Sequence, residues 1–217
     1  VKDREDDARN RAIFEEGVEI VLKSWTEESF SHRGLNWQIP FPGDTGVEDW
    51  PLARAGVTQR LGAPGEIDEA TGATRRVSVC PAPYTRPHPP VFVSGSGSPE
   101  TISFCGRHGF IPTYFASIGS AGPLSEHYRR AAAASGRDFR PGQNQCLVRW
   151  IQIGRTEEDA LDRIRAYDMD IWKNFYAAMG RRTVENDDYF GSLVNSGLFV
   201  FGTVESVRRQ LIEQWKV

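Results

Sequence analysis

The sequence has few cysteines, no long apolar run and no excess of charge of either sign. Its three cysteines, Cys80, Cys105 and Cys146, lie too far apart for a CxxC metal pair and are too few for a disulfide framework. Lysine plus arginine total 26 and aspartate plus glutamate total 29, so the net charge is −3. Such a balance gives no strong field for nucleic acid or an anionic membrane. No stretch approaches the roughly 18 apolar residues of a spanning helix. We therefore expect a cytoplasmic protein with reduced thiols and no leader sequence, nucleic-acid partner or membrane partner.

Residues with the spacing of a metal site or a catalytic triad are also lacking. None of the four histidines stands in an HExxH-like pattern, and no Ser-His-Asp or Cys-His set follows from the spacing. His88 lies between prolines and predicts a turn, whereas His108 suits the end of a helix. We interpret His32 and His127 as surface residues. Asp168 and Asp170 are two positions apart on a predicted helix and so indicate a solvated acidic face. The sequence thus predicts no metal and assigns no catalytic residue.

The first third of the chain predicts one amphipathic helix followed by irregular structure. Apolar residues recur at helical spacing from Phe14 to Trp25, which predicts a helix over about Asp6–Ser24. Ser29–Ile39 predicts a short strand or hairpin with Gly34 at the turn. The Gly-, Pro- and Asp-rich stretch Pro40–Thr74 predicts an insertion or long loop, with a short helix near Val47–Ala55.

From residue 76 onward strands and helices alternate. Expected strands are 77–80, 91–94, 110–115 and 145–153, with a brief extended run at 198–201. Expected helices are 99–108, 123–135, 157–179 and 204–214, with caps at Ser98, Thr156 and Thr203. This alternation is typical of a parallel sheet covered by helices. Only three of the strands, 91–94, 110–115 and 145–153, have the character of core strands, whereas a closed eight-stranded barrel takes about 250 residues. The chain is therefore either a small open α/β sheet or part of a larger fold.

The stretch from Val91 to Thr101 has the pattern of a phosphate-binding loop. A short apolar strand leads through Gly-Ser-Gly-Ser into a helix with Pro99 at its first position. Glycines let a ligand approach the backbone, and the N–H groups and dipole of the helix favour an anion. Candidate ligands of the phosphate are Gly95, Ser96, Gly97, Ser98 and Thr101. The pattern is neither a dinucleotide fingerprint nor a P-loop, because Glu100 replaces the third glycine and no Gly-Lys-Ser follows. A tight turn with an ordinary helix cap remains the alternative.

Four segments in order resemble the bacterial luciferase-like flavin monooxygenases. They are Phe14–Glu28, Pro87–Thr101, Ile151–Ala160 and Phe201–Val207. The resemblance implies a TIM-type (β/α)8 barrel, an α/β fold, present only in part. The chain would run from helix four to a point before strand eight, with residues 1–217 as one partial domain and 40–74 as its insertion.

The resemblance also implies a chemistry. In such enzymes reduced FMN and O2 oxygenate a small organic substrate, and a separate flavin reductase supplies the flavin. The phosphate would lie in the loop after strand five, which here corresponds to the candidate residues above. Two alternatives stay open: a deazaflavin-dependent oxidoreductase that transfers hydride, and a non-catalytic flavin-binding protein. The substrate and the oligomeric state, monomer or homo-oligomer, are equally open.

Overall fold

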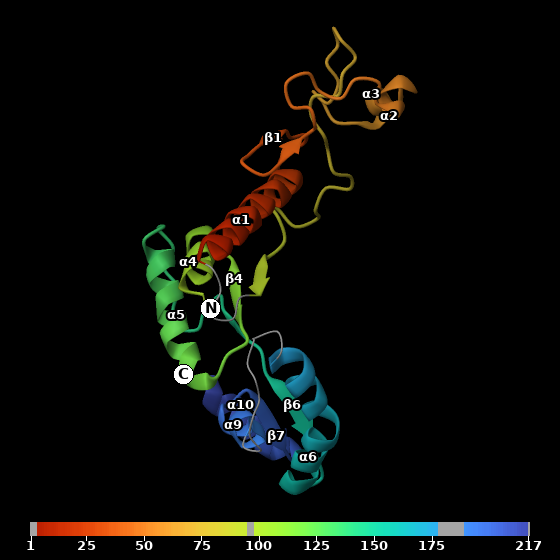
Figure 1. Ribbon diagram of the computed structural model, residues 1–217. Coiled ribbons are helices and arrows are strands. Elements are labelled where there is room, and N and C mark those ends of the chain that lie inside the picture. Colours follow the sequence, from red (N-terminus) through yellow and green to blue (C-terminus); the bar gives the residue numbers. More distant parts are fainter. Residues whose placement is uncertain (1–3, 95–97, 178–188, 217) are drawn as a thin grey trace. The chain divides into compact units, whose positions relative to one another are not determined.

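The computed structural model describes residues 4–94, 98–177 and 189–216 (Figure 1). The chain divides into two compact units, Val1–Pro89 and Pro90–Val217. Each unit is described by itself.

The first unit begins with the helix α1 (Arg4–Thr26) and the hairpin of β1 (His32–Arg33) and β2 (Gln38–Ile39). The two strands pair antiparallel, and the Gly34 N–H donates to the Trp37 carbonyl at 2.9 Å. Both expectations for this region are confirmed, with the helix two residues longer at each end. The turn is held to the helix by Glu16, whose carboxylate accepts hydrogen bonds from the N–H groups of Asn36 and Trp37 and from the Asn36 amide. One acid on α1 therefore fixes the hairpin.

His32 is not a surface residue, which corrects the sequence interpretation. Only 3% of it is exposed, its Nε2 lies 3.0 Å from Glu16 Oε1, and its Nδ1 lies 3.2 Å from Lys23 Nζ. A long-range partnership between a helix and a hairpin leaves no trace in local spacing. His32 and Glu16 together form a polar contact between the hairpin and α1.

The first prediction concerns the pH dependence of this contact between His32 and Glu16. Desolvation alone would raise the pKa of Glu16, but hydrogen bonds from His32, Asn36 and Trp37 outweigh it and lower the pKa from 4.5 to about 2. A depressed pKa gives stability that is complete above pH 4.5 and is lost as the pH falls toward 2. We expect Glu16→Gln to destabilise the chain at pH 7 and to flatten its loss of stability between pH 4.5 and 2. Urea unfolding at several pH values measures this, with Glu15→Gln as the neighbouring control. Parallel pH profiles for Glu16→Gln and the parent chain would contradict the prediction.

The predicted insertion contains two short helices, α2 (Pro51–Arg54) and α3 (Val57–Leu61). The first lies within the range expected for a helix, and the second was not expected. Antiparallel bridges join Thr74 to Val47 and to Ile67. The strand predicted at 77–80 is wrong, because only Val77 pairs, through one bridge to Phe30. Val79 and Cys80 are exposed there, and the following Pro81 has no N–H for a sheet.

In the second unit, parallel strands alternate with helices. Its strands are β3 (Phe92–Ser94), β4 (Ile111–Tyr114), β5 (Cys146–Leu147), β6 (Trp150–Ile153) and β7 (Phe199–Gly202). Its helices are α4 (Pro99–His108), α5 (Ile118–Ala133), α6 (Glu157–Arg163), α7 (Met169–Ile171), α9 (Tyr189–Asn195) and α10 (Val204–Gln214), with π-helical turns η1 (Ile164–Asp168) and η2 (Trp172–Tyr176). The sheet β3-β4-β5 and the pair β6-β7 are parallel throughout, as the alternation predicted.

The strand expected over 145–153 divides between two sheets. The Val148 N–H donates to the carbonyl of Tyr114 at the end of β4, whereas the Trp150 N–H donates to the carbonyl of Leu198 just before β7. The same run of chain thus pairs with β4 through its first half and with β7 through its second. Sequence periodicity cannot show such a change of partner. β7 coincides with the brief extended run expected at 198–201, and it pairs in parallel with β6.

Two helix predictions need correction. α5 begins at Ile118, so Pro123 lies inside the helix and not at its start. Pro123 has no backbone N–H, so the helix lacks only the hydrogen bond that this group would donate to the Gly119 carbonyl in the first turn. The helix predicted over 157–179 starts at Glu157 as expected, but passes through η1 and η2 within the described residues.

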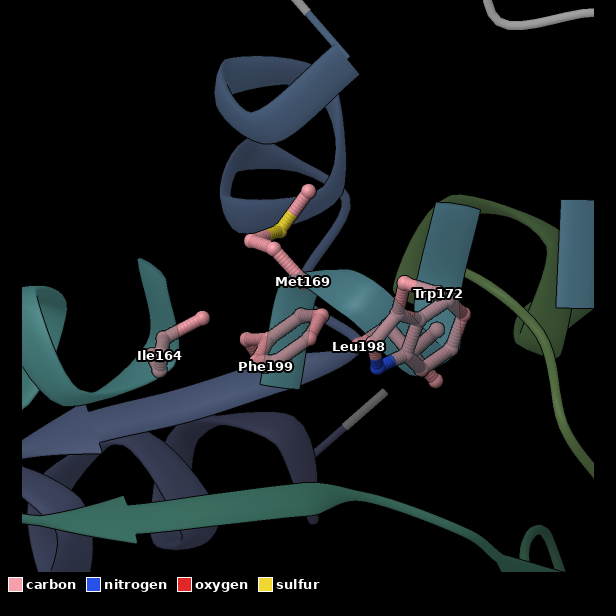
Figure 2. Close-up of a cluster of buried hydrophobic side chains, with 5 residues drawn as sticks. All are labelled: Ile164, Met169, Trp172, Leu198 and Phe199. Atoms are coloured by element: carbon pink, nitrogen blue, oxygen red, sulfur yellow. The ribbon is translucent and has the colours of Figure 1, made fainter. Parts of the chain in front are cut away.

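An aromatic core holds the helical run against β6 and β7. Figure 2 shows its buried members, Ile164, Met169, Trp172, Leu198 and Phe199. The ring of Trp172 stacks on Phe115 at a centroid distance of 5.6 Å and also packs on Trp150 and Phe199. Large aromatic side chains of this kind bury much apolar surface each and are therefore strong contributors to the stability of a core.

The acidic pair on this helical run is not a uniform solvated face. Asp170 is exposed and accepts a hydrogen bond from Asn174 at 2.7 Å. Asp168 is half-buried, and its Oδ2 is sealed from solvent without a partner in the described part of the chain. The π-helical turn ending at Asp168 shifts the register of the helix, so simple helical spacing misplaces this side chain.

Candidate functional site

The loop between β3 and α4 lies at the carboxyl end of a parallel strand. Ser94 ends β3, and Pro99 begins α4. β4 runs parallel beside β3 with Ser94 opposite Thr113, so both strands end at the same edge. Loops at this edge of parallel α/β sheets are where ligands bind. Three predicted ligands, Gly95, Ser96 and Gly97, lie outside the described residues.

Ser98 and Thr101 take the places that the sequence predicted for them. Ser98 is the N-cap of α4, and its Oγ lies 3.5 Å from the Thr101 N–H. This contact is long for a hydrogen bond, so the cap satisfies the N–H only weakly. The Thr101 N–H can therefore donate to an anion at the helix end, where the helix dipole also favours negative charge.

Glu100 is the one feature of the first turn that opposes an anion. The Ser98 hydroxyl donates to Glu100 Oε2 at 2.6 Å. A phosphate at this position would compete with the carboxylate for the same hydroxyl hydrogen. Binding therefore requires Ser98 to exchange a partner within its own helix for the ligand.

α5 supports α4 at close range. A Cβ on Gly106 would lie 2.7 Å from Ala131 Cβ and 2.9 Å from the Tyr128 carbonyl, so glycine allows the two helices to touch. His127 Nε2 lies 2.7 Å from Ser103 Oγ and 3.0 Å from the Pro99 carbonyl. His127 is thus half-buried between the helices and ties α5 to the first turn of α4. The surface interpretation of His127 misses this contact.

A buried polar network fixes the other end of α4 and α5. The Tyr128 hydroxyl donates to the Phe110 carbonyl at 3.0 Å, and the Asn144 amide donates to the Tyr128 oxygen at 2.6 Å. Burial raises the pKa of Tyr128 and that of the Cys105 thiol, the latter to about 11. Both groups are therefore neutral at physiological pH and act as packing residues. His108 stacks on Phe110 at the end of α4, as a helix-terminal residue would.

A second helix start at the same edge was missed. Ser117 is the N-cap of α5 after β4, and its Oγ lies 2.9 Å from Ser120 Oγ. The run Ser-Ile-Gly-Ser after a predicted strand indicates a helix N-cap at Ser117. The helix was instead expected to begin at Pro123, because proline is common at the first helical position. Ser117 and Ser120 add two exposed hydroxyls after the strand next to β3.

Two other kinds of site are not found in the part of the chain that the structure describes. No helix there is both long and apolar enough to cross a membrane. No group of three or more His, Cys, Asp or Glu side chains among the same residues could hold a metal ion.

Comparisons with known proteins identify the family. The family model described as luciferase-like monooxygenase matches residues 2–196. The chain therefore belongs to the luciferase-like monooxygenase family, as the resemblance predicted. No curated protein matches the chain.

Solved structures share the fold. One is the oxygenating constituent of 3,6-diketocamphane monooxygenase from the CAM plasmid of Pseudomonas putida, a type II Baeyer-Villiger monooxygenase in complex with FMN. It is 18% identical with a TM-score of 0.57, over 93% of this chain and 52% of that one. Another is the monooxygenase RslO1 from Streptomyces bottropensis, which is 18% identical with a TM-score of 0.59, over 94% of this chain and 50% of that one. The chain thus spans about half the length of these structures.

Proposed function

We propose that the chain is the flavin-phosphate-binding part of an FMN-dependent monooxygenase that oxygenates a small organic substrate. A separate reductase would supply the reduced flavin. The observation that carries the proposal is the start of α4, where Ser98 and the Thr101 N–H stand at the carboxyl end of β3. Membership of the luciferase-like monooxygenase family and the FMN in one related structure support it.

The residues present fit the phosphate of FMN. Thr101 offers a weakly used N–H and a hydroxyl, and Ser98 offers a hydroxyl whose hydrogen can move from Glu100 to a phosphate oxygen. Serine and threonine hydroxyls together with helix N–H groups are common phosphate ligands. When bound, reduced FMN supplies the electrons that activate O2. The contribution of this chain is to hold the phosphate, orient the ring and help exclude water.

The experiment is an anaerobic titration of the chain with reduced FMN and, separately, with reduced riboflavin, which lacks the phosphate. We expect the Ser98→Ala, Thr101→Ala double variant to bind FMN about tenfold more weakly or worse, because two charge-assisted contacts are lost. Riboflavin binding should change by less than twofold. Ser135→Ala, an exposed serine beyond α5, is the matched control and should bind both flavins as the parent does.

Glu100→Gln tests the same phosphate from the opposite side. This variant removes a negative charge from the first turn and frees the Ser98 hydroxyl, so FMN should bind severalfold more tightly. An equal effect of these variants on FMN and riboflavin would refute the placement of the phosphate. Preference for reduced deazaflavin over FMN would move the assignment to hydride transfer. If the protein binds FMN but consumes no O2 with any substrate tried, the non-catalytic alternative holds.

A further inference from the structure

The first turn of α4 is held only weakly by its own cap. The Ser98 Oγ lies 3.5 Å from the Thr101 N–H, and the Ser98 hydroxyl donates to Glu100. Pro99, the first residue of the helix, has no N–H to donate. The Ile102 N–H closes the turn by donating to the Ser98 carbonyl at 3.1 Å. The cap therefore leaves the exact position of this turn to contacts from outside the helix.

His127 on α5 makes such a contact, and the geometry identifies which ring nitrogen carries the hydrogen. Its Nε2 lies 3.0 Å from the Pro99 carbonyl oxygen and 2.7 Å from Ser103 Oγ. A carbonyl oxygen can only accept, so an Nε2 without a hydrogen would meet it lone pair to lone pair. The arrangement therefore requires an N–H on Nε2 that donates to Pro99. The Ser103 hydroxyl then accepts from the same N–H as a second partner.

Two other contacts between α4 and α5 lie farther along the helices. The close approach at Gly106 is about 10 Å from Pro99 along the helix, at 1.5 Å per residue. The Tyr128 hydroxyl donates to the Phe110 carbonyl, beyond the end of α4. These contacts hold the two helices together without involving the first turn of α4. Loss of the His127 side chain should therefore leave the helix pair joined and act mainly on the position of that turn.

We propose that His127 is a positioning residue for the phosphate of the flavin. It does not touch the ligand. Its Nε2–H holds the Pro99 carbonyl and so fixes the direction in which the Ser98 hydroxyl and the Thr101 N–H point. Hydrogen bonds weaken steeply as their angle departs from linearity, so a small rotation of the turn lowers the affinity for phosphate. This inference rests on the proposed function, which places the phosphate at Ser98 and Thr101.

Anaerobic titration of the chain with reduced FMN and with reduced riboflavin tests this role. His127→Leu replaces the imidazole by a side chain of similar size without a donor, and should weaken FMN binding about fivefold, the net worth of one hydrogen bond. Riboflavin lacks the phosphate, so its affinity should stay within about twofold of that of the parent chain. His127→Gln should restore FMN binding, because the glutamine Nε2 can donate to the Pro99 carbonyl. Ser103→Ala leaves the Nε2 hydrogen to Pro99 alone and should bind FMN as the parent does.

Tyr128→Phe is the matched control that separates positioning from stability. It removes the hydroxyl that donates to the Phe110 carbonyl at the other end of the helix pair. This variant should lower the melting temperature and leave the ratio of FMN to riboflavin affinity unchanged, whereas His127→Leu should lower the ratio. Nitrogen-15 NMR of the parent chain gives an independent check, because the proposal requires a hydrogen on the Nε2 of His127.

Three results would overturn the proposal: FMN affinity of the parent chain in His127→Leu, equal weakening of both flavins by His127→Leu, or a His127→Gln variant that binds FMN as weakly as His127→Leu. The Ser98→Ala, Thr101→Ala double variant distinguishes this failure from that of the proposed function. If the double variant loses FMN selectively and His127→Leu does not, the phosphate site stands and only the role of His127 is refuted. If the double variant affects both flavins equally, both proposals fail.

Discussion

Replacing Trp172 by alanine is expected to lower the free energy of unfolding of the second unit by about 3–5 kcal/mol. Trp172 is 4% exposed, and its ring packs against Phe115, Trp150, Tyr176 and Phe199. Removing it leaves a cavity that rigid neighbouring rings fill poorly. Because this side chain contacts the residue that follows β4 as well as β6, β7 and the helical run, its loss weakens the packing among all four.

Denaturant unfolding followed by circular dichroism measures this loss. Trp215→Ala is the matched control, because it makes the same chemical change at a residue that is 88% exposed. That variant should change the stability by less than about 0.5 kcal/mol. If Trp172→Ala lowers the free energy of unfolding by less than about 1 kcal/mol, the aromatic core is not the main source of the stability of the second unit.

Gly106→Ala should also destabilise the second unit, although alanine is the better helix former. The added Cβ would lie 2.7 Å from Ala131 Cβ and 2.9 Å from the backbone nitrogen of Ala132. Overpacking of this kind costs about 1–3 kcal/mol, and the gain in helix propensity offsets at most about 1 kcal/mol. Because α4 must move away from α5, the first turn of α4 moves with it and FMN binding should weaken.

The matched control is Gly119→Ala on α5. A Cβ there meets no atom within 4 Å, so alanine should stabilise the unit by about 0.5–1 kcal/mol through propensity alone. Thermal unfolding of the two variants should therefore move in opposite directions. If both raise the melting temperature, the close contact between α4 and α5 does not constrain the helices.

Local signals predicted the elements near the phosphate loop well. Ser98, Pro99 and Gly109 define the start and end of α4 at the residues that capping chemistry requires. The same chemistry placed Thr156 and Thr203 as caps whose hydroxyls accept from the N–H groups three residues on. Such features depend on a few neighbouring residues and can therefore be predicted from a single sequence.

Partnerships between distant segments were not predictable in this way. The contact of His32 with Glu16 and that of His127 with the Pro99 carbonyl each join two elements. Neither contact can be predicted before the positions of both elements are known. For the phosphate site, the cap residues could be read from the sequence, but the support given by α5 and the competition from Glu100 could not.

The divided strand over 145–153 has a consequence for cooperativity. Its first half is hydrogen-bonded to β4 and its second to β7, and Arg149 at the junction donates to the carbonyls of Ala116 and Val148 and to the side chain of Gln214. Neither sheet can open without exposing part of a strand that the other needs. We therefore expect the two sheets to unfold together, so that hydrogen exchange of the amides on both sides of Arg149 reports one common opening and not two local ones.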